Sequence, residues 1–520
     1  MPAPLFTTNP AEFTRLEGLY IFEQDPPAFI RGVDLGVVGI FGRTLKGPVD
    51  KAVEITSESR FIEVFGADRH AVGGGAILND VWKEMLNKPF GKLVIVRAAA
   101  SAAVAASLDA EDGTGGVGVA ILRIAASSPG IWGNDVAVEV VNATDGDVNH
   151  FNLEVTYKGA TTTYKNLNVF STSDNTATVV GSDDGRLITL TKLAAGRPAN
   201  FSTIVETNWE ANDNADDSMN LGKTLTAYST VAGTDGTIAT SDYTAANRAF
   251  DKIKEYKGVS LVLMADGGVQ ATIASVNATM KTQALIASDR MFLMWYGSFG
   301  QTVATVVADA ASFRSDRVIY CYNDVTTLDP EAAVNVETAP HSWMASIMSQ
   351  TDVDIHPGEE ATKRFTGGIK SLRFEGMARE DYVSLRSAGI AALEKDAEGG
   401  FVFVSGVVTD LTPGKTEITR RRMADFLQLS VANRLKFFVK KKNTTENRIR
   451  MGGEVTAFLN GLKSEGRIVE DFEVDQESQN TLTSRGEGKE FILMRVRLIG
   501  HMLFLILKTE IGTGVTIEAG

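Results

Sequence analysis

The sequence predicts a multidomain protein of the α/β plus α+β class, with an extended arm at each end. Two separate stretches, 33–98 and 236–345, alternate helical patterns with continuous apolar strands and indicate one discontinuous α/β domain. Between them, residues 99–235 have the composition of a β-rich insertion. Helices and strands return in 346–507, the predicted C-terminal α+β domain. A chain of 520 residues has room for these three domains, at roughly 100–200 residues each.

Residues 1–32 predict an extended N-terminal arm. Three prolines fall within the first ten positions, and Asp25-Pro-Pro27 follows later. Proline fixes the backbone and removes a hydrogen-bond donor, so a packed element is not expected here. Leu19-Tyr-Ile-Phe22 predicts one short strand within the arm.

The two α/β stretches predict a mainly parallel sheet covered on both faces, because continuous apolar strands separated by helices are typical of such sheets. In the first stretch, strands are expected at 36–42 and 93–96, with a helix at 76–86 between them. In the second stretch we expect helices at 246–256, 270–286 and 301–313, and strands at 259–264, 291–296 and 317–322.

The insertion and the C-terminal domain differ in pattern. Alternating runs predict strands at 136–141, 151–157 and 187–190, in a separately folded and outward-facing insertion. In the C-terminal domain, amphipathic patterns predict helices at 423–438 and 455–462, and residues 490–507 predict two strands broken near Gly500.

The last residues, 508–520, predict a C-terminal arm. Val515 and Ile517 share one face of a short strand that follows Gly512 and Gly514. A strand of about five residues is not stable alone, so it needs the edge of a sheet to join.

Composition excludes several classes of function. The formal net charge of −14 argues against general nucleic-acid binding. The single cysteine, Cys321, lies in an apolar run and is expected to be a buried hydrophobic residue. The first residues show no signal peptide, and Met502-Leu-Phe-Leu-Ile-Leu507 is far shorter than the ~20 residues that span a bilayer. We therefore expect a protein made in the cytoplasm without membrane insertion.

No motif indicates a catalytic, cofactor or metal site. Gly113-Thr-Gly-Gly-Val-Gly118 matches the sequence pattern of a dinucleotide-binding loop. However, a predicted strand follows it, whereas a dinucleotide-binding loop is followed by a helix. Asp145, Asp147 and Asn149 begin like a calcium loop, but His150 occupies the glycine position. The histidines are scattered, and His356 near Glu359 and Glu360 predicts a polar loop. We expect no enzyme, although a site assembled across the fold would be invisible in the sequence.

Two basic runs lie at the ends of the predicted helix 423–438. One is Arg420, Arg421 and Arg422; the other is Lys436 with Lys440, Lys441 and Lys442. A solvated charged face is one interpretation, and a surface that binds an acidic partner is the other. A solvated face is the favoured interpretation, but the first run gives some weight to a partner, because cations at a helix N-terminus oppose the helix dipole.

Several segments, in this order along the chain, resemble the contractile tail sheath proteins of phages and related injection systems. They are Gly18-Leu-Tyr-Ile-Phe-Glu23, Ile30-Arg-Gly-Val33, Gly36-Val-Val-Gly-Ile-Phe-Gly42, Lys46-Gly-Pro-Val49, Ile55-Thr-Ser57, Phe61-Ile-Glu-Val-Phe-Gly66, Ser128-Pro-Gly-Ile-Trp-Gly-Asn-Asp135, Gly399-Gly-Phe-Val-Phe-Val-Ser-Gly406, Arg421-Arg-Met423, Phe458-Leu-Asn-Gly-Leu462 and Asp475-Gln-Glu-Ser-Gln-Asn480. The segment that contains Trp132 is the most specific match. Each motif is weak alone, but the order of so many is informative.

The resemblance implies a structural subunit that forms stacked rings around an inner tail tube, in the tail sheath of a virion assembled in the host cytoplasm. The partners implied are further copies of the chain, the tail tube protein, and the baseplate and tail terminator proteins, without nucleic acid or cofactor. The terminal arms would each add a strand to a neighbouring subunit, and contraction would drive the tube through the host envelope.

The resemblance also assigns residues. The strands donated to neighbours would be Leu19, Tyr20, Ile21, Phe22 and Glu23, and Val515, Thr516, Ile517 and Glu518. The inward C-terminal domain would make the two basic runs possible tube-facing residues. A secreted or surface β-rich adhesin is the main alternative. It is disfavoured by the absent signal peptide and by the α/β pattern of 246–322.

Overall fold

The computed structural model describes residues 5–6, 20–21, 30, 32–66, 93–112, 119–170, 174–202, 229–256, 258–264, 292–297, 299–329 and 334–503. The chain divides into two compact units. We call residues 34–422 the body, and residues 1–33 with 423–520 the terminal unit.

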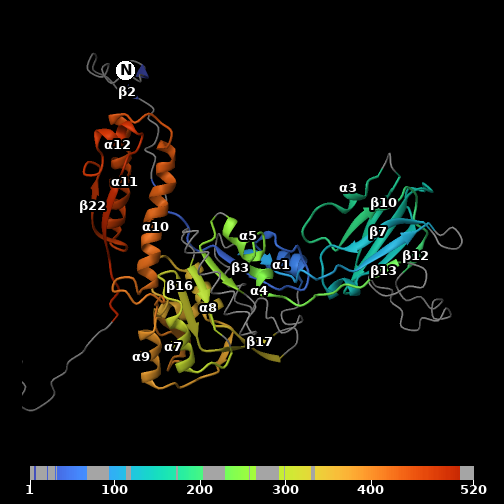
Figure 1. Ribbon diagram of the computed structural model, residues 1–520, viewed down its shortest axis with the longest axis horizontal. Helices are drawn as coiled ribbons and strands as arrows, with labels where there is room; N and C mark the ends of the chain where they lie inside the picture. The colour runs from blue at the N-terminus through green and yellow to red at the C-terminus, as the bar shows by residue number, and fades with distance from the viewer. Residues whose placement is uncertain are drawn as a thin grey trace, which may run out of the picture. The chain divides into compact units, whose positions relative to one another are not determined.

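The body is built on an eight-stranded sheet in the order β21-β20-β16-β15-β14-β3-β5-β4 (Figure 1). The six inner strands run parallel, and β4 and β21 add antiparallel edges. The strands are β3 (Val38–Gly42), β4 (Ala52–Ile55), β5 (Leu93–Arg97), β14 (Leu261–Met264), β15 (Phe292–Trp295), β16 (Val318–Tyr322), β20 (Ile390–Lys395) and β21 (Phe401–Phe403). The predicted mainly parallel sheet is confirmed.

Helices cover both faces of this sheet. One face packs on α1 (Glu58–Phe65) and on α8 (His341–Gln350), whose Trp343 and Ile347 are buried with Cys321. The other face packs on α4 (Thr240–Thr244), α5 (Ala249–Glu255), α7 (Val303–Ala311) and α9 (Arg379–Ser387). The helices expected at 246–256 and 301–313 are therefore present, whereas those expected at 76–86 and 270–286 lie outside the described residues.

The expected boundary at residues 345–346 lies instead near residue 422. The reason is β20, which pairs in parallel with β16 and so extends the body sheet beyond the expected boundary. The segment before β20 also belongs to the body, through the small sheet of β17 (Val325–Asp329), β18 (Val334–Thr338) and β19 (Ile369–Leu372) and the 3-10 helix η4 (Glu360–Phe365).

The insertion consists of two four-stranded antiparallel sheets that share one core (Figure 1). The orders are β10-β9-β8-β12 and β11-β7-β6-β13. The strands are β6 (Ser107–Glu111), β7 (Ala120–Ala126), β8 (Ala137–Asn142), β9 (Phe151–Tyr157), β10 (Ala160–Leu167), β11 (Ile188–Lys192), β12 (Phe201–Ser202) and β13 (Ser229–Val231), with helix α3 (Thr176–Val180). All three strands expected in this region are present.

The segment Ser128–Asp135, which we call the Trp132 motif, connects the insertion to the body sheet. It forms the 3-10 helix η2 (Ile131–Asp135), and its tryptophan is buried in the insertion core. Arg97, at the end of β5, donates to the carbonyl of Gly47 (2.9 Å), the hydroxyl of Ser128 (3.0 Å) and the carbonyl of Pro129 (2.8 Å). Burial lowers the pKa of Arg97 to about 10. The motif is therefore a structural joint.

The terminal unit contains a helical hairpin and a two-stranded sheet. Its elements are the part of α10 (Ile418–Leu435) from residue 423, η5 (Lys436–Phe438), α11 (Thr445–Glu465), β22 (Val469–Asp475), α12 (Leu482–Gly486) and β23 (Leu493–Leu498). Both helices predicted in this region are present, and β23 is the first of the two strands predicted in 490–507. Among the described residues, no helix combines the length and hydropathy that crossing a membrane requires.

Candidate assembly site in the terminal unit

Both chain ends leave from the terminal unit. On the N-terminal side, the backbone N–H of Val33 donates to the hydroxyl of Ser430 on α10 (3.2 Å). A Cβ on Gly32 would lie 2.7 Å from the ring of Phe426, so this glycine allows the chain to lie closely against the helix. On the C-terminal side, the described chain ends at residue 503, five residues after β23. Both predicted arms therefore start at the unit that carries β22 and β23.

The sheet of this unit has two open edges among the described residues. Strands β22 and β23 pair only with each other, in antiparallel register from Asp475 opposite Leu493 to Val469 opposite Leu498. An isolated pair of strands is marginally stable in water. Each outer edge presents unpaired N–H and C=O groups that can pair with a further strand.

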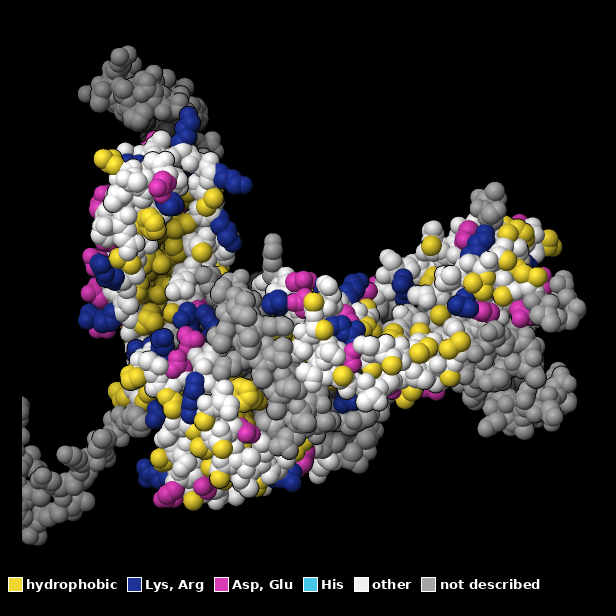
Figure 2. All heavy atoms as spheres, in the orientation of Figure 1, with side chains coloured by type: hydrophobic (Ala, Val, Ile, Leu, Met, Phe, Trp, Pro, Cys, Tyr) yellow, Lys and Arg dark blue, Asp and Glu magenta, His cyan; other side chains and the backbone are white. Residues whose placement is uncertain are grey.

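The two faces of the sheet differ in chemistry. On one face, Phe472 pairs with Val496 and Val474 with Met494, all half-buried. Figure 2 shows hydrophobic side chains gathered along the terminal unit between α10 and the side of β22. On the other face, acidic side chains of β22 meet basic side chains of β23. Glu473 lies 2.9 Å from Arg495, and Asp471 lies 3.5 Å from Arg497.

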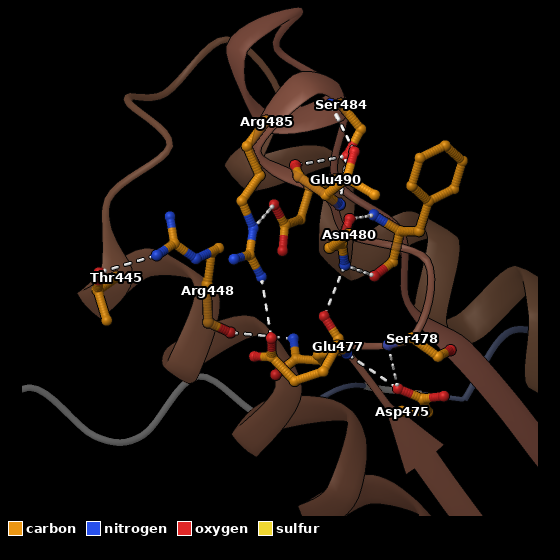
Figure 3. A network of polar contacts seen from close by, with 12 residues as sticks. Thr445, Arg448, Asp475, Glu477, Ser478, Asn480, Ser484, Arg485 and Glu490 are labelled. Atoms are coloured by element: carbon orange, nitrogen blue, oxygen red, sulfur yellow. Dashed lines mark hydrogen bonds and ion pairs between the residues drawn. The ribbon is translucent and has the colours of Figure 1, made fainter.

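The connection between the two strands is held by a polar network (Figure 3). The carboxylate of Asp475 accepts hydrogen bonds from the backbone N–H groups of Glu477 (2.9 Å) and Ser478 (3.0 Å). A hydrogen bond from the Ser478 hydroxyl, together with these two backbone bonds, lowers the pKa of Asp475 to about 2. The segment Asp475-Gln-Glu-Ser-Gln-Asn480 therefore forms a fixed turn at the end of β22.

Asn480 closes this connection. Its buried side chain donates to the carbonyls of Gln476 and Phe491, both at 2.7 Å, and accepts from the N–H of Phe491 at 2.8 Å. Arg485 of α12 adds ion pairs with Glu477 and Glu490, each at 3.5 Å. These contacts set where β23 begins and so fix its position beside β22.

The predicted donated strands fall largely outside the described residues. Tyr20–Ile21 forms β2, which pairs in parallel with β1 (Leu5–Phe6) of the same chain. Leu19, Phe22 and Glu23, and Val515, Thr516, Ile517 and Glu518, lie outside the described part of the chain. Strand donation therefore stays a prediction.

The first basic run does not form one surface. Arg420 is exposed, whereas Arg421 is half-buried with Nη1 3.4 Å from a carboxylate oxygen of Asp316. Arg422 is buried, at 2% exposure. The prediction that Arg422 is a possible tube-facing residue is therefore wrong.

Arg422 instead caps the C-terminus of α8. Its Nη2 donates to the carbonyls of Met348 (2.7 Å) and Thr351 (3.0 Å), and its Nη1 to that of Asp352 (3.3 Å). A cation at this position satisfies the last carbonyls of a helix and complements its dipole. Burial lowers the pKa of Arg422 to about 10, although the carboxylates of Asp352, Asp354 and Asp34 oppose the shift.

The second basic run is exposed. Lys436, Lys440, Lys441 and Lys442 all lie on the surface of the terminal unit, beyond the end of α10. Nearby Phe437 is 46% exposed, with the Nζ of Lys441 3.2 Å from its ring centroid. Sequence reasoning missed this aromatic residue, because a phenylalanine at the end of an amphipathic helix resembles core. It also missed β22, although Asp471-Phe-Glu-Val-Asp475 alternates polar and apolar residues.

The titratable clusters of the body have structural contacts of their own. The ring nitrogens of His356 lie 3.0 and 3.2 Å from the backbone nitrogens of Gly358 and Gly406, which fits the expected polar loop. Glu360, Asp396 and Glu398 form one close carboxylate group among the described residues. The ammonium of Lys363 binds two of its members, each at 2.5 Å.

Comparison with solved structures finds many similar chains, and three of them match along most of their length. The sheath tail protein of Desulfitobacterium hafniense has a TM-score of 0.56 at 13% identity, over 93% of this chain and 100% of that one. The sheath tail protein Lin1278 of Listeria innocua has a TM-score of 0.57 at 13% identity, over 90% and 96%. The helical sheath of the anti-feeding prophage in the contracted state has a TM-score of 0.54 at 13% identity, over 96% and 99%.

The chain therefore has the fold of these sheath proteins along nearly its whole length. No model of a known protein family matches the sequence. No curated protein matches it either.

Proposed function

We propose that the chain is the structural subunit of a contractile tail sheath, which polymerises around an inner tail tube and contracts to drive that tube through the host envelope. The observation that carries the proposal is the two-stranded sheet of the terminal unit. Both its edges are open among the described residues, and both chain ends leave from the same unit. The shared fold with sheath proteins supports the same interpretation.

In this proposal, neighbouring copies complete the sheet through their arms. Val515 and Ile517 of one copy would extend the half-covered apolar face of a neighbour, and Thr516 and Glu518 would extend its charged face. The edge of β23 suits this strand, because its charged face carries Arg495 and Arg497. The acidic side chains of β22 would repel Glu518. Charge therefore favours β23 as the acceptor of the C-terminal arm.

The arms also account for contraction without a nucleotide. Main-chain hydrogen bonds between copies keep the subunits linked while the rigid units change their packing. The extended sheath would be a metastable state, and contraction a cooperative switch to a second packing.

The same proposal assigns the partners. Further copies of the chain would form the rings, with the baseplate at one end of the sheath and the tail terminator at the other. The inner face would contact the tail tube, and Arg420, Arg421, Lys436, Lys440, Lys441 and Lys442 stay possible tube-facing residues. Completed subunits would be made and assembled in the host cytoplasm and function in the tail of the virion.

Electron microscopy of the purified full chain tests the proposal. We expect rings or tubular polymers over a range of salt and protein concentration, because the open sheet edges of each copy accept arms from others. Single, separate molecules under every condition would contradict the proposal and return the adhesin and the enzyme to consideration.

A further inference from the structure

We propose that His341 makes α8 an acid-sensitive switch in the body. Uptake of one proton by the buried ring opens the contact between α8 and the body sheet. This opening also releases the first turn of α10, residues 418–422. The proposal concerns the body alone, so its test is independent of whether the chain forms a sheath.

The ring of His341 is buried in the first turn of α8. Its exposed fraction is 4%, and its Nε2 lies 2.9 Å from the carbonyl oxygen of Met264, the last residue of β14. A carbonyl oxygen only accepts, so Nε2 carries the proton and Nδ1 is left as an acceptor. Among the described residues, Nδ1 has no hydrogen-bond partner. The site therefore holds the neutral ring.

A second proton on this ring would be an unpaired buried charge, which is unfavourable. The ring also lies at the positive end of the α8 dipole, where a cation is disfavoured further. Burial accordingly lowers the pKa of His341 to about 4, although the hydrogen bond to Met264 opposes the shift. A protonated ring reaches water only if the first turn of α8 leaves the sheet.

One ionisable network adjoins His341, beyond the ends of β15 and β16. Tyr296 stacks on His341 with the ring centroids 6.0 Å apart, and its hydroxyl donates to Asp324 at 2.7 Å. Asp324 lies 3.6 Å from Nη1 of Arg373, which binds Glu337 at 2.7 Å. The carboxylates of this network thus have partners of their own, and they do not form an ion pair with His341.

The elements packed against α8 are β14, β15, β16 and η4. Strands β14 and β15 contain no ionisable side chain. The ionisable side chains of the other two elements are Tyr320, Cys321 and Tyr322 of β16, and Glu360, Lys363 and Arg364 of η4. The tyrosines pack on the opposite face of the sheet, and burial raises the pKa of Cys321, which stays neutral. Lys363 binds Glu360 at 2.5 Å. His341 therefore has no ionic partner on these elements.

The other end of α8 holds the first turn of α10. Arg422 donates to the carbonyls of Met348 and Thr351, at 2.7 and 3.0 Å. Every residue from His341 to Ser349 is buried, so α8 is fixed along its whole length. A helix of ten residues moves as one piece, and release of its first turn therefore displaces the carbonyls that hold Arg422.

Acid should open this contact. In the open state the ring has an ordinary pKa of about 6.5, whereas in the closed state the pKa is about 4. The contribution of neutral His341 to stability is complete above about pH 6.5 and is lost as the pH falls through the lowered pKa. Burial raises the pKa of Asp324, so its protonation favours the closed body and has the opposite sign.

Hydrogen exchange of the full chain, followed by mass spectrometry between about pH 7 and pH 4, measures the opening. After correction for the intrinsic exchange rate, the protection of α8 and of residues 418–422 should fall together by about a hundredfold. Unchanged protection of α8 in the unmodified chain would overturn the proposal. A fall confined to α8, with residues 418–422 still protected, would also overturn it.

Substitution separates His341 from the other acidic and basic groups, which all variants share. His341→Gln keeps a donor for the carbonyl of Met264 but takes up no proton, so it should remove most of the fall in protection. His341→Phe keeps an aromatic ring against Tyr296 and serves as a second variant in case the first does not fold. His501→Gln, at a half-buried position of the terminal unit, is the matched control and should keep the full fall.

Two results with these variants would contradict the role of His341. One is a fall in the His341 variants as large as in the unmodified chain. The other is a fall that His501→Gln removes equally well.

Discussion

At the scale of single residues, position in the fold separates charges that look alike in the sequence. Arg420 and Arg422 are two positions apart, yet Arg420 is exposed and Arg422 is buried against the end of α8. The sequence places both in one basic run. It cannot show which of them faces α8, because that depends on how two distant helices pack.

The substitution Arg422→Ala should lower the free energy of unfolding by about 3 kcal/mol, because it leaves the carbonyls of Met348 and Thr351 without their donor. Urea unfolding of the monomeric protein measures the effect. Arg420→Ala is the control and should change stability by less than about 0.5 kcal/mol. Similar values for both variants would contradict the capping role of Arg422.

Asn480→Ala should destabilise the terminal unit by about 2–3 kcal/mol, because the N–H and carbonyl of Phe491 and the carbonyl of Gln476 lose their partner. Hydrogen exchange of the β22 and β23 amides locates the effect. Asn460→Ala, at an exposed position of α11, is the matched control. Unchanged protection in the Asn480 variant would show that the turn does not hold the strands.

His150 gives a pH-dependent contact in the insertion. Its Nδ1 lies 2.6 Å from a carboxylate oxygen of Asp145, whose hydrogen bond raises the pKa of His150 and lowers the pKa of Asp145. Protonated His150 makes its full contribution to stability below about pH 6.5. That contribution is lost as the pH rises through the raised pKa of His150. Ionised Asp145 makes its full contribution to stability above about pH 3.9. That contribution is lost as the pH falls through the lowered pKa of Asp145.

The pair should therefore be most stabilising between about pH 4 and pH 6.5. Proton NMR of the His150 ring should show a midpoint above about 6.5, which Asp145→Asn should return toward that value. A midpoint that the variant leaves unchanged would contradict the contact.

At the scale of elements, prediction succeeds where burial dominates. Strands such as β3 and β14 are apolar at nearly every position because both faces of the body sheet are covered by helices. That pattern is visible without a structure. Strand β22 was not predicted, because one of its faces carries the charged residues Asp471 and Glu473. Its apolar face is only half-buried in a single chain. The boundary near residue 422 was not predicted, because β20 joins a parallel sheet whose other parallel strands all lie before residue 323.

The candidate site was predictable only in part. The glycines and alternation of 512–518 indicate an arm that needs a sheet edge, but not which edge receives it. That edge depends on the pairing of β22 with β23, and on the turn that Asn480 holds.

Proline substitutions at two adjacent positions of the C-terminal arm test whether the arm is donated as a strand. Successive N–H groups of an added strand point alternately toward and away from the sheet that it joins. One of Thr516→Pro and Ile517→Pro should therefore block polymer formation, and the other should reduce it far less. Light scattering during assembly measures both. Full polymerisation by both variants would contradict donation of residues 515–518.

At the scale of the whole molecule, the two arms should be needed for assembly but not for folding. Deleting residues 1–22 or 513–520 should abolish sheath polymers, because each deletion removes one proposed strand. Circular dichroism should show a folded monomer in both cases, because the body and its cores lie within residues 34–422. Normal polymers from either truncation would refute strand exchange by that arm.

The joint at the base of the insertion has a consequence for engineering. The chain enters the insertion at Val104 and leaves it at Thr234, and these two residues pair as a β-bridge. Asn134 holds the exit through both backbone groups of Gly233, at 2.7 and 3.1 Å. Entry and exit are therefore neighbours, which is the arrangement that tolerates replacement of a domain. A foreign module with closely spaced termini could be spliced between them, giving a scaffold that displays one cargo per copy.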